Sequence, residues 1–352
     1  MSFLADHIRA MHGYTYGEQP SDRSVIKLNT NENPFPPSPA IRETLVNLDL
    51  EELRRYPDAT SLVLREHIAA RFGLTSGQVL ITNGGDEAIR LVATACLTRN
   101  DVMVSSEPGY SLYPVIANVL NARWLPMELG HDFRPDSEAA RRCIGQRARL
   151  VCIPNPNAPS GVLLTAQEVD AFAARFRGPL LIDEAYVDFI EPALKHDLVP
   201  LLARHRNLLL LRTFSKGYSL AGARVGYLLG EESFIEELAT KVRDSYNVNC
   251  ISQIVALAAF GDQEHARKTW EVVRLERQRV SDVLRERGFN VPDSQANFVL
   301  PQRRDKASLG DTYERLRDSN ILVRYFKTTR LYDRLRVTIG TRTQNDAFLK
   351  AL

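Results

Sequence analysis

The sequence predicts an α/β fold, with a large domain built on a mostly parallel, mixed β-sheet flanked by helices and a smaller α+β domain. Apolar, strand-like runs alternate with helix-length segments between about residues 79 and 229, as they do in parallel sheets covered on both faces. Polar or glycine-rich residues come directly after several of these runs. After about Gly261 a long helix and shorter elements follow, which indicates a second structural unit.

The predicted large domain spans residues 49–261. A turn at Tyr56-Pro57-Asp58 leads into a helix at about residues 61–72. Continuous apolar runs of four to six residues are typical of strands buried on both faces. We expect strands at 79–82, 102–105, 149–153, 179–182, 207–211 and 225–229, and helices between them at 85–97, 112–120 and 166–176.

The predicted small domain combines residues 262–352 with an N-terminal arm, residues 1–48. Its long helix, about 263–287, ends at Gly288, a suitable C-terminal cap. Further strands are expected at 297–300, 321–326 and 335–339, and helices at 309–318 and from Gln344. In the arm, the nine residues 29–37 contain three asparagines and three prolines and cannot form a regular element. This stretch is either an exposed linker or an ordered polar loop that lines a site.

The composition argues against several classes of protein. The 352 residues are 44% hydrophobic and 25% charged, with a formal net charge of +2, which does not indicate a nucleic-acid surface. No apolar run approaches transmembrane length, and Asp6 and His7 lie where a signal peptide would be apolar. Cys96, Cys143, Cys152 and Cys250 show no metal-binding or disulfide spacing. We therefore expect a cytoplasmic protein that uses no metal, membrane or nucleic acid.

Polar residues follow five of the predicted strands. In open α/β sheets, ligands bind at the carboxyl ends of the strands, so these segments should converge on one rim. They are Asn83–Gly85, Glu107–Tyr110, Asn155–Gly161, Asp183–Tyr186 and Thr213–Lys216.

Lys216 lies in the segment RTFSKGYSLAGARVGY, residues 212–227, directly after a very apolar run. A desolvated lysine with a lowered pKa can form a Schiff base with an aldehyde cofactor. Ser215 and Arg224 could hold a phosphate beside it. The alternative is a surface lysine on a loop.

Asp183 ends the buried run 179–182. A desolvated carboxylate needs a partner, and a protonated ring nitrogen would provide one while keeping the ring an electron sink. A metal is the other interpretation, but no second ligand is apparent. Tyr110 could stack on a planar ring, and the helix that begins near Gly85 could bind a phosphate at its N-terminus.

Arginines lie within two apolar strands of the small domain, at Arg324 and Arg336. An arginine there needs an anionic partner, either a substrate carboxylate or phosphate or a structural carboxylate. For Arg336 the surrounding strand and glycine turn favour a substrate.

Six short sequence blocks stand out: LNTNENP at 28–34, YPD at 56–58, NGGDEAI at 83–89, DEAY at 183–186, RTFSKGYSLAGARVGY at 212–227 and RVTIGTR at 336–342. Together they resemble the blocks of the fold-type I pyridoxal-phosphate aminotransferases, and specifically those of the histidinol-phosphate aminotransferases. The similarity extends from Asn29 to Arg342, nearly the whole chain.

This resemblance implies a pyridoxal 5'-phosphate (PLP) site. Lys216 would carry the cofactor and move a proton, Asp183 would pair with the ring nitrogen, Tyr186 would bond the ring oxygen and Tyr110 would stack on the ring. The cofactor phosphate would contact Gly85, Asp86, Thr213, Ser215 and Arg224. Tyr56 would reach the phosphate of the other subunit, which implies a homodimer with shared sites. Arg336 would bind the substrate anion, in a pocket lined by Tyr14, Asn33 and Arg324.

One position departs from the family pattern. The family usually has asparagine immediately before the proline of the cofactor loop, where this chain has Ala158. The hydrogen bond to the ring oxygen would then come from Asn157 or be missing.

The resemblance predicts transfer of the amino group of L-histidinol phosphate to 2-oxoglutarate, giving imidazole acetol phosphate and L-glutamate, in histidine biosynthesis. Two alternatives share the fold and motifs: a decarboxylase of threonine phosphate and an aromatic amino-acid aminotransferase. A cofactor-sensing regulator would need a DNA-binding module, which residues 1–48 are too short and too proline-rich to supply.

Overall fold

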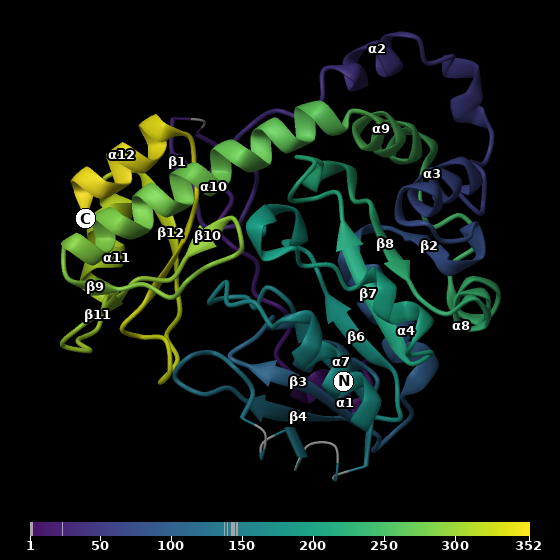
Figure 1. Cartoon of the computed structure of the whole chain (residues 1–352), viewed down its shortest axis with the longest axis horizontal. Coiled ribbons are helices and arrows are strands. Elements are labelled where there is room, and N and C mark those ends of the chain that lie inside the picture. The colour runs from purple at the N-terminus through teal and green to yellow at the C-terminus, as the bar shows by residue number, and fades with distance from the viewer. Residues whose placement is uncertain (1–2, 23, 137, 139, 142–144, 146) are drawn as a thin grey trace.

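The computed structural model describes residues 3–22, 24–136, 138, 140, 141, 145 and 147–352, so Cys143 lies outside the described residues. A large lobe surrounds a seven-stranded sheet and a small lobe surrounds a four-stranded sheet. The long helix α10 (Gln263–Glu286) runs from one lobe to the other (Figure 1). The predicted α/β fold class is therefore confirmed.

The large sheet is parallel except for one strand. β8 runs antiparallel to both of its neighbours, and the other strands pair in parallel. The strand order is β2 (Val79–Thr82), β8 (Gly226–Leu229), β7 (Leu208–Thr213), β6 (Leu180–Asp183), β5 (Ala148–Pro154), β3 (Val102–Glu107) and β4 (Arg123–Glu128). Every residue of β2, β6, β7 and β8 is buried, because helices cover both faces.

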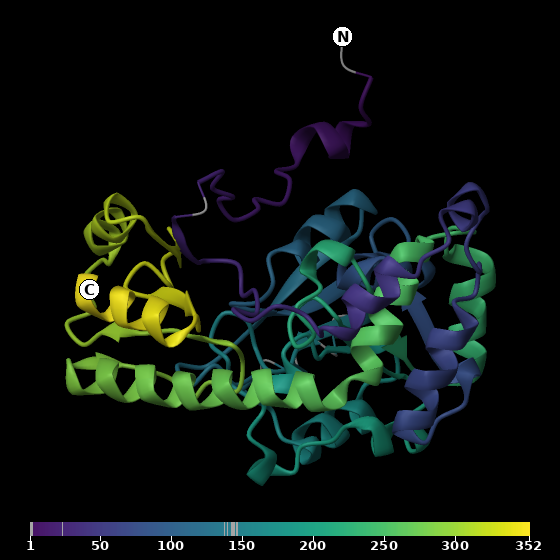
Figure 2. The same cartoon turned by 90° about the horizontal axis from the view of Figure 1, so that it is seen from above.

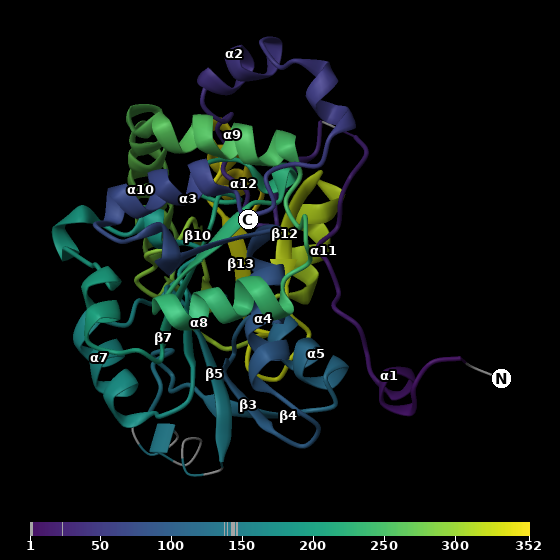
Figure 3. The same ribbon diagram turned by 90° about the vertical axis from the view of Figure 1, so that its right-hand side faces the viewer.

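Alternate residues of the central strands enter two separate cores. Leu208 and Leu210 of β7 pack in the core that includes residues of α3 (Leu62–Phe72), α7 (Ala166–Arg175) and α9 (Cys250–Gly261). Leu209 and Leu211 face the core formed with α4 (Gly84–Cys96), α5 (Leu112–Val119) and α8 (Glu232–Glu237). Figure 3 shows α7 and α5 on opposite sides of the sheet.

The small lobe contains a mixed sheet. Its strand order is β1 (Ile26–Leu28), β12 (Ile321–Tyr325), β13 (Leu335–Thr338) and β10 (Phe298–Val299). β1 pairs in parallel with β12, which ties the N-terminal arm to the C-terminal part of the chain. The remaining elements are α11 (Gly310–Asp318), α12 (Arg342–Ala351) and the hairpin of β9 (Phe289–Asn290) and β11 (Gln302–Arg303).

The N-terminal arm contacts both lobes. Its first helix, α1 (Asp6–Ala10), stands out from the body of the molecule (Figure 2). Further along, α2 (Ala40–Val46) packs beside α9, and Ile41 enters the core of the large lobe. The arm therefore does not belong to the small lobe alone, and the boundary at residue 48 stays a prediction.

The remaining elements are short helices. The 3-10 helices lie at Leu50–Arg54, Ser76–Gln78, Val187–Phe189, Pro192–Leu194, Val199–Ala203 and Ala221–Ala223, and a π-helix lies at Leu238–Val242. Among the described residues, the helices are too short or too polar to cross a membrane.

Leu210 provides a test of the buried sheet. Its side chain is fully buried, whereas Leu275 on α10 is 64% exposed. We expect Leu210→Ala to lower the free energy of unfolding by about 2–5 kcal/mol, because it leaves a cavity. The same exchange at Leu275 should change it by less than about 0.5 kcal/mol. Urea denaturation of both variants measures this, and equal losses would contradict the assigned core.

Candidate active site

A cavity of about 520 Å³ lies between the two lobes, at the carboxyl ends of β5, β6 and β7. Most of the residues predicted from the sequence line it, and they come from both lobes and from the N-terminal arm. They are Tyr14, Gly85, Asp86, Tyr110, Asp183, Tyr186, Thr213, Ser215, Lys216, Arg224, Arg324 and Arg336. Asn33, Tyr56 and Asn157 do not line this cavity.

Asp183 is the last residue of β6 and is buried. Its Oδ2 atom accepts a hydrogen bond from the hydroxyl of Tyr113 at 2.9 Å, and its Oδ1 atom accepts one from the backbone N–H of Ala185 at 3.1 Å. Burial raises the pKa of Asp183 to about 6, although these two hydrogen bonds oppose the shift. Both donors are uncharged groups, so they orient the carboxylate but leave its negative charge in place. This charge can then pair with a cation.

Lys216 follows β7 and is partly buried. Its Nζ atom donates a hydrogen bond to the backbone carbonyl of Thr30 at 3.0 Å. Burial, together with the positive charge of Arg336, lowers the pKa of Lys216 to about 8. A lysine with such a pKa presents a neutral, nucleophilic amine far more often at neutral pH than an exposed lysine does.

Residues 29–31 of the N-terminal arm contact three of these side chains in succession. The carbonyl of Asn29 accepts a hydrogen bond from Arg336 at 2.8 Å, and that of Thr30 accepts from Lys216. The Nδ2 atom of Asn31 donates to the hydroxyl of Tyr186 at 2.9 Å. Residues 29–31, which follow β1, thus belong to an ordered loop that lines a site, one of the two predicted interpretations.

One end of the cavity is built to receive an anion. The guanidinium of Arg224 lies 3.4 Å from the hydroxyl of Ser215 and 3.3 Å from a carboxylate oxygen of Asp86. Gly84, at the start of α4, has a φ of +78°, and a Cβ atom there would lie 2.5 Å from Arg224. Only glycine therefore lets the arginine approach the N-terminus of this helix, where free backbone N–H groups attract anions.

Aromatic side chains form one wall of the cavity. Tyr110 donates a hydrogen bond to Asp86 at 3.0 Å and makes edge-to-face contacts with Tyr14 and Tyr113. The hydroxyl of Tyr113 in turn bonds Asp183. Tyr113 was not among the predicted site residues, although it lies on α5 only three residues after Tyr110, which precedes that helix.

Two arginines enter the cavity from the small lobe. Arg324 and Arg336 lie opposite each other on β12 and β13. Arg336 has its guanidinium over the rings of Phe298 and Phe326, and its buried Nε atom has no hydrogen-bond partner. Burial lowers the pKa of Arg336. A buried guanidinium with an unsatisfied donor suits an anionic ligand.

Three predicted residues lie elsewhere. The amide of Asn157 bonds the carbonyl of Pro108 and the hydroxyl of Ser160, so it holds its own loop together, and Ala158 lines the cavity instead. The amide of Asn33 contacts the carbonyl of Gly217. Tyr56 is 79% exposed and stacks on Tyr246 at 4.4 Å.

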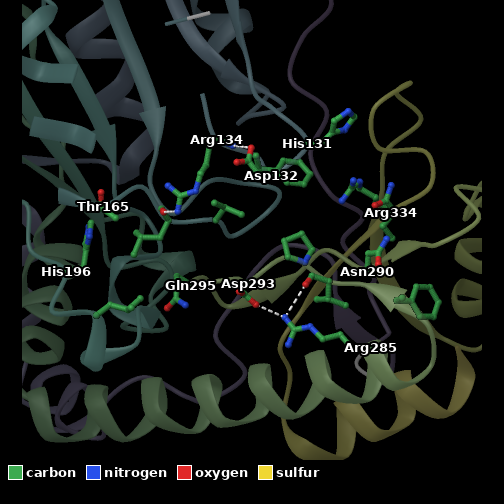
Figure 4. A pocket seen from close by; sticks show the side chains of 18 of the residues that line it. His131, Asp132, Arg134, Thr165, His196, Arg285, Asn290, Asp293, Gln295 and Arg334 are labelled. Carbon is green, nitrogen blue, oxygen red and sulfur yellow. Dashed lines mark hydrogen bonds and ion pairs between the residues drawn. The ribbon is translucent and has the colours of Figure 1, made fainter. Parts of the chain in front are cut away.

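A larger cavity of about 920 Å³ lies elsewhere between the lobes (Figure 4). Two of its arginines pair with carboxylates of the protein: Arg134 with Glu168 at 2.6 Å and Arg285 with Asp293 at 2.7 Å. Arg334 lies over the ring of Phe133, and its buried Nε atom has no hydrogen-bond partner. None of the predicted site residues lines this cavity. We therefore place the candidate active site in the smaller one.

The chain is similar to known proteins over its full length. Residues 23–352 match the family model described as aminotransferase class I and II. Histidinol-phosphate aminotransferase 1 of Nostoc sp. is 37% identical and the histidinol-phosphate aminotransferase of Brachyspira hyodysenteriae is 35% identical. Each alignment covers 100% of this chain, with 97% of the first relative and 98% of the second.

Solved structures show the same fold. The histidinol-phosphate aminotransferase of Sinorhizobium meliloti, in complex with pyridoxal-5'-phosphate, has a TM-score of 0.91 at 24% identity, over 100% of this chain and 97% of that one. A mutant aspartate aminotransferase of Thermus thermophilus has a TM-score of 0.81 at 22% identity, over 100% of both chains.

The raised pKa of Asp183 predicts a gain in stability on neutralising this residue. The folded chain binds a proton at Asp183 up to about pH 6, whereas the ordinary pKa is 3.8. This carboxyl therefore costs stability increasingly as the pH rises between these values. For the ligand-free protein at pH 8, we expect Asp183→Asn to raise the free energy of unfolding by up to about 3 kcal/mol.

Urea denaturation at pH 8 and pH 5 measures this, with the exposed Asp318→Asn as control. The gain should shrink at the lower pH. A loss of stability in the Asp183→Asn protein at pH 8 would contradict the assigned electrostatics.

Proposed function

Because the chain belongs to the class I and II aminotransferases, and among them to the histidinol-phosphate aminotransferases, we propose that it uses PLP to transfer the amino group of L-histidinol phosphate. The acceptor is 2-oxoglutarate and the products are imidazole acetol phosphate and L-glutamate, in histidine biosynthesis. The observation that carries this proposal is the cavity shared by the amine of Lys216 and the buried carboxylate of Asp183. Location in the cytoplasm stays a prediction from the sequence.

The residues of the cavity fit PLP at three points. Asp183, buried and held by neutral donors, would pair with the ring nitrogen. Arg224, Ser215, Thr213 and the N-terminus of α4 at Gly85 and Asp86 would hold the phosphate. Tyr110 would lie against the ring. When bound, PLP supplies an aldehyde that links to amines and a ring that withdraws electrons from the substrate's α-carbon.

Asp183 keeps the ring nitrogen protonated. A carboxylate with few charged neighbours gains most from a cation placed against it, since the site is desolvated. The hydroxyl of Tyr113 fixes the direction of the carboxylate. Binding of a cationic ring nitrogen should therefore lower the raised pKa of Asp183 and keep it ionised.

Lys216 would have two roles. Its amine would hold the cofactor, and its Nζ atom, when free, would accept and return a proton as a general acid–base. Its lowered pKa of about 8 suits both directions of transfer near neutral pH. The carbonyl of Thr30 offers the free amine a resting position within the cavity.

Arg336 and Arg324 would bind the anionic end of the substrate. Arg336 already forms a hydrogen bond through Nη2 to the carbonyl of Asn29, and its Nε donor is free for a ligand. Tyr14 lies on the N-terminal arm and lines the same cavity. We also retain Asn33 as a predicted substrate residue, although its amide now contacts Gly217.

We further propose a homodimer with shared sites. Large apolar side chains are exposed together on the segment 45–63, and a monomer rarely leaves such a patch uncovered. They are Leu45, Val46, Leu50, Leu53, Tyr56, Leu62 and Val63. In a dimer that buries this patch, Tyr56 could reach the cofactor phosphate of the partner subunit, as the family resemblance implies.

The donor is tested by a half-reaction. When the protein loaded with PLP is mixed with histidinol phosphate alone, we expect the cofactor's absorbance to convert to that of its amine form. Lys216→Ala should abolish steady-state turnover, because no amine remains to move the proton. Lys216→Arg, which keeps the charge but cannot form the Schiff base, should also be inactive.

Three results would contradict this proposal. No conversion by histidinol phosphate would reject it as the donor, and phenylalanine serves as the comparison for an aromatic amino-acid aminotransferase. Release of carbon dioxide from threonine phosphate would support the decarboxylase instead. Retained turnover in Lys216→Ala would reject the role of the lysine.

The shared site is tested by complementation. Lys216→Ala and Tyr56→Ala proteins should each have low activity at limiting PLP. After joint unfolding and refolding, hybrid dimers should regain activity, because one of their two sites contains neither substitution. Lys216→Ala mixed with Lys216→Arg is the control and should regain none. If the refolded mixture of Lys216→Ala and Tyr56→Ala is no more active than either variant alone, the two subunits do not share their sites.

A further inference from the structure

The order of the strands divides the cavity into two sides. Gly85, Arg224 and Ser215 adjoin β2, β8 and β7, whereas Tyr186 follows β6 and Ala158 follows β5. In PLP, the carbon that bears the aldehyde lies between the carbons that carry the phosphate arm and the phenolic oxygen. With the phosphate on the side of β7 and β8, the phenolic oxygen therefore faces the side of Tyr186 and Ala158.

This second side has few hydrogen-bond donors. Ala158 is buried and packs with Ala296, Phe298 and Tyr186, so its part of the wall is apolar. The amide of Asn157 is occupied by Pro108 and Ser160. Among the described residues that line this side of the cavity, Tyr186 and Asn31 bring polar side chains to it. The charged group beside them is the guanidinium of Arg336, which lies over the ring of Phe298.

Asn31 is held in one orientation. It is 2% exposed and has a φ of +57°. Its backbone N–H donates to the hydroxyl of Thr338 at 3.0 Å, and that hydroxyl lies 3.2 Å from the Oδ1 atom of Asn31. The hydroxyl already accepts from the N–H, so its proton goes to Oδ1. The Nδ2 group must then face Tyr186, which it contacts at 2.9 Å.

The hydroxyl of Tyr186 accordingly accepts a hydrogen bond from Asn31. Its own proton is left free, and a hydroxyl that accepts one hydrogen bond becomes a stronger donor of the next. The edge-to-face contact of Tyr186 with Phe298, at 5.0 Å between ring centroids, limits movement of the ring.

We propose that Asn31 is a positioning residue that directs the hydroxyl proton of Tyr186 to the phenolic oxygen of PLP, on a wall where Ala158 offers no donor. This inference rests on the proposed function. It assigns to the N-terminal arm a part in tuning the cofactor, in addition to its contacts with Lys216 and Arg336.

The test is the pH titration of the absorbance of bound PLP, without substrate. In the bound cofactor, one proton is shared between the Lys216 nitrogen and the phenolic oxygen of PLP. A hydrogen-bond donor to that oxygen stabilises the negative charge that remains on it when the proton leaves. Without the donor, the proton should therefore leave at a higher pH. We expect Asn31→Gly to raise the pH midpoint of the titration by about one unit, the equivalent of one hydrogen bond to a charged group. Glycine is chosen because it adopts the positive φ without strain.

Two further variants separate positioning from a structural role. Tyr186→Phe should raise the midpoint at least as much, and adding Asn31→Gly to it should raise it no further, because Asn31 acts through Tyr186. Asn320→Gly is the matched control. Asn320 also has a positive φ, of +59°, but it is exposed and does not line the cavity, so its midpoint should stay at the wild-type value. Thermal unfolding verifies that all variants fold.

An unchanged midpoint in Asn31→Gly would overturn the inference, as would a full additional shift in the double variant. These outcomes leave the proposed function intact. If the wild-type protein with PLP shows no pH-dependent absorbance, the proposed function fails and this inference fails with it.

Discussion

A carboxylate at the buried end of a strand is the interaction on which the site depends. The central strands of the large sheet are mostly apolar, since helices cover both faces. Asp183 departs from this pattern at the last residue of β6, where a tyrosine hydroxyl and a backbone N–H hold its carboxylate. The chain therefore folds around an acid whose charge is unfavourable until a cation binds, and the pKa of about 6 expresses that cost.

The N-terminal arm joins this strand end to the small lobe. Its residues 29–31 reach Arg336, Lys216 and Tyr186 with one hydrogen bond each, while β1 just before them pairs with β12. A movement of the small lobe relative to the large sheet would therefore change the surroundings of Lys216 and of Arg336 together. The arm thus couples the two lobes at the site itself.

Much of this arrangement follows from the sequence, because the large strands are apolar and end in polar residues. The strands at 79–82 and 225–229 and the helices around them lie within a few residues of their predicted positions. Other elements carry no such signal. β4 contains Pro126 and charged residues at both ends, which an edge strand tolerates, and β1 has three residues.

The types of residue in the site could be predicted from the sequence, but the contacts between them could not. Asp183, Lys216 and Arg336 stand out as charges within or directly after apolar strands. The roles of Tyr113 and Asn31 depend on hydrogen bonds between residues far apart in the chain, which no local pattern encodes. The amide of Asn157 is likewise taken up by Ser160 in its own loop and by Pro108, which lies 49 residues earlier in the chain.

The proposed function requires that Lys216 carries PLP in this cavity. Reduction of the PLP-loaded protein with borohydride fixes the cofactor to the lysine that holds it, and mass spectrometry of the peptides locates the adduct. We expect one pyridoxyl adduct per chain, on Lys216. An adduct on another lysine, such as Lys27 of the N-terminal arm, or no adduct at all, would contradict it.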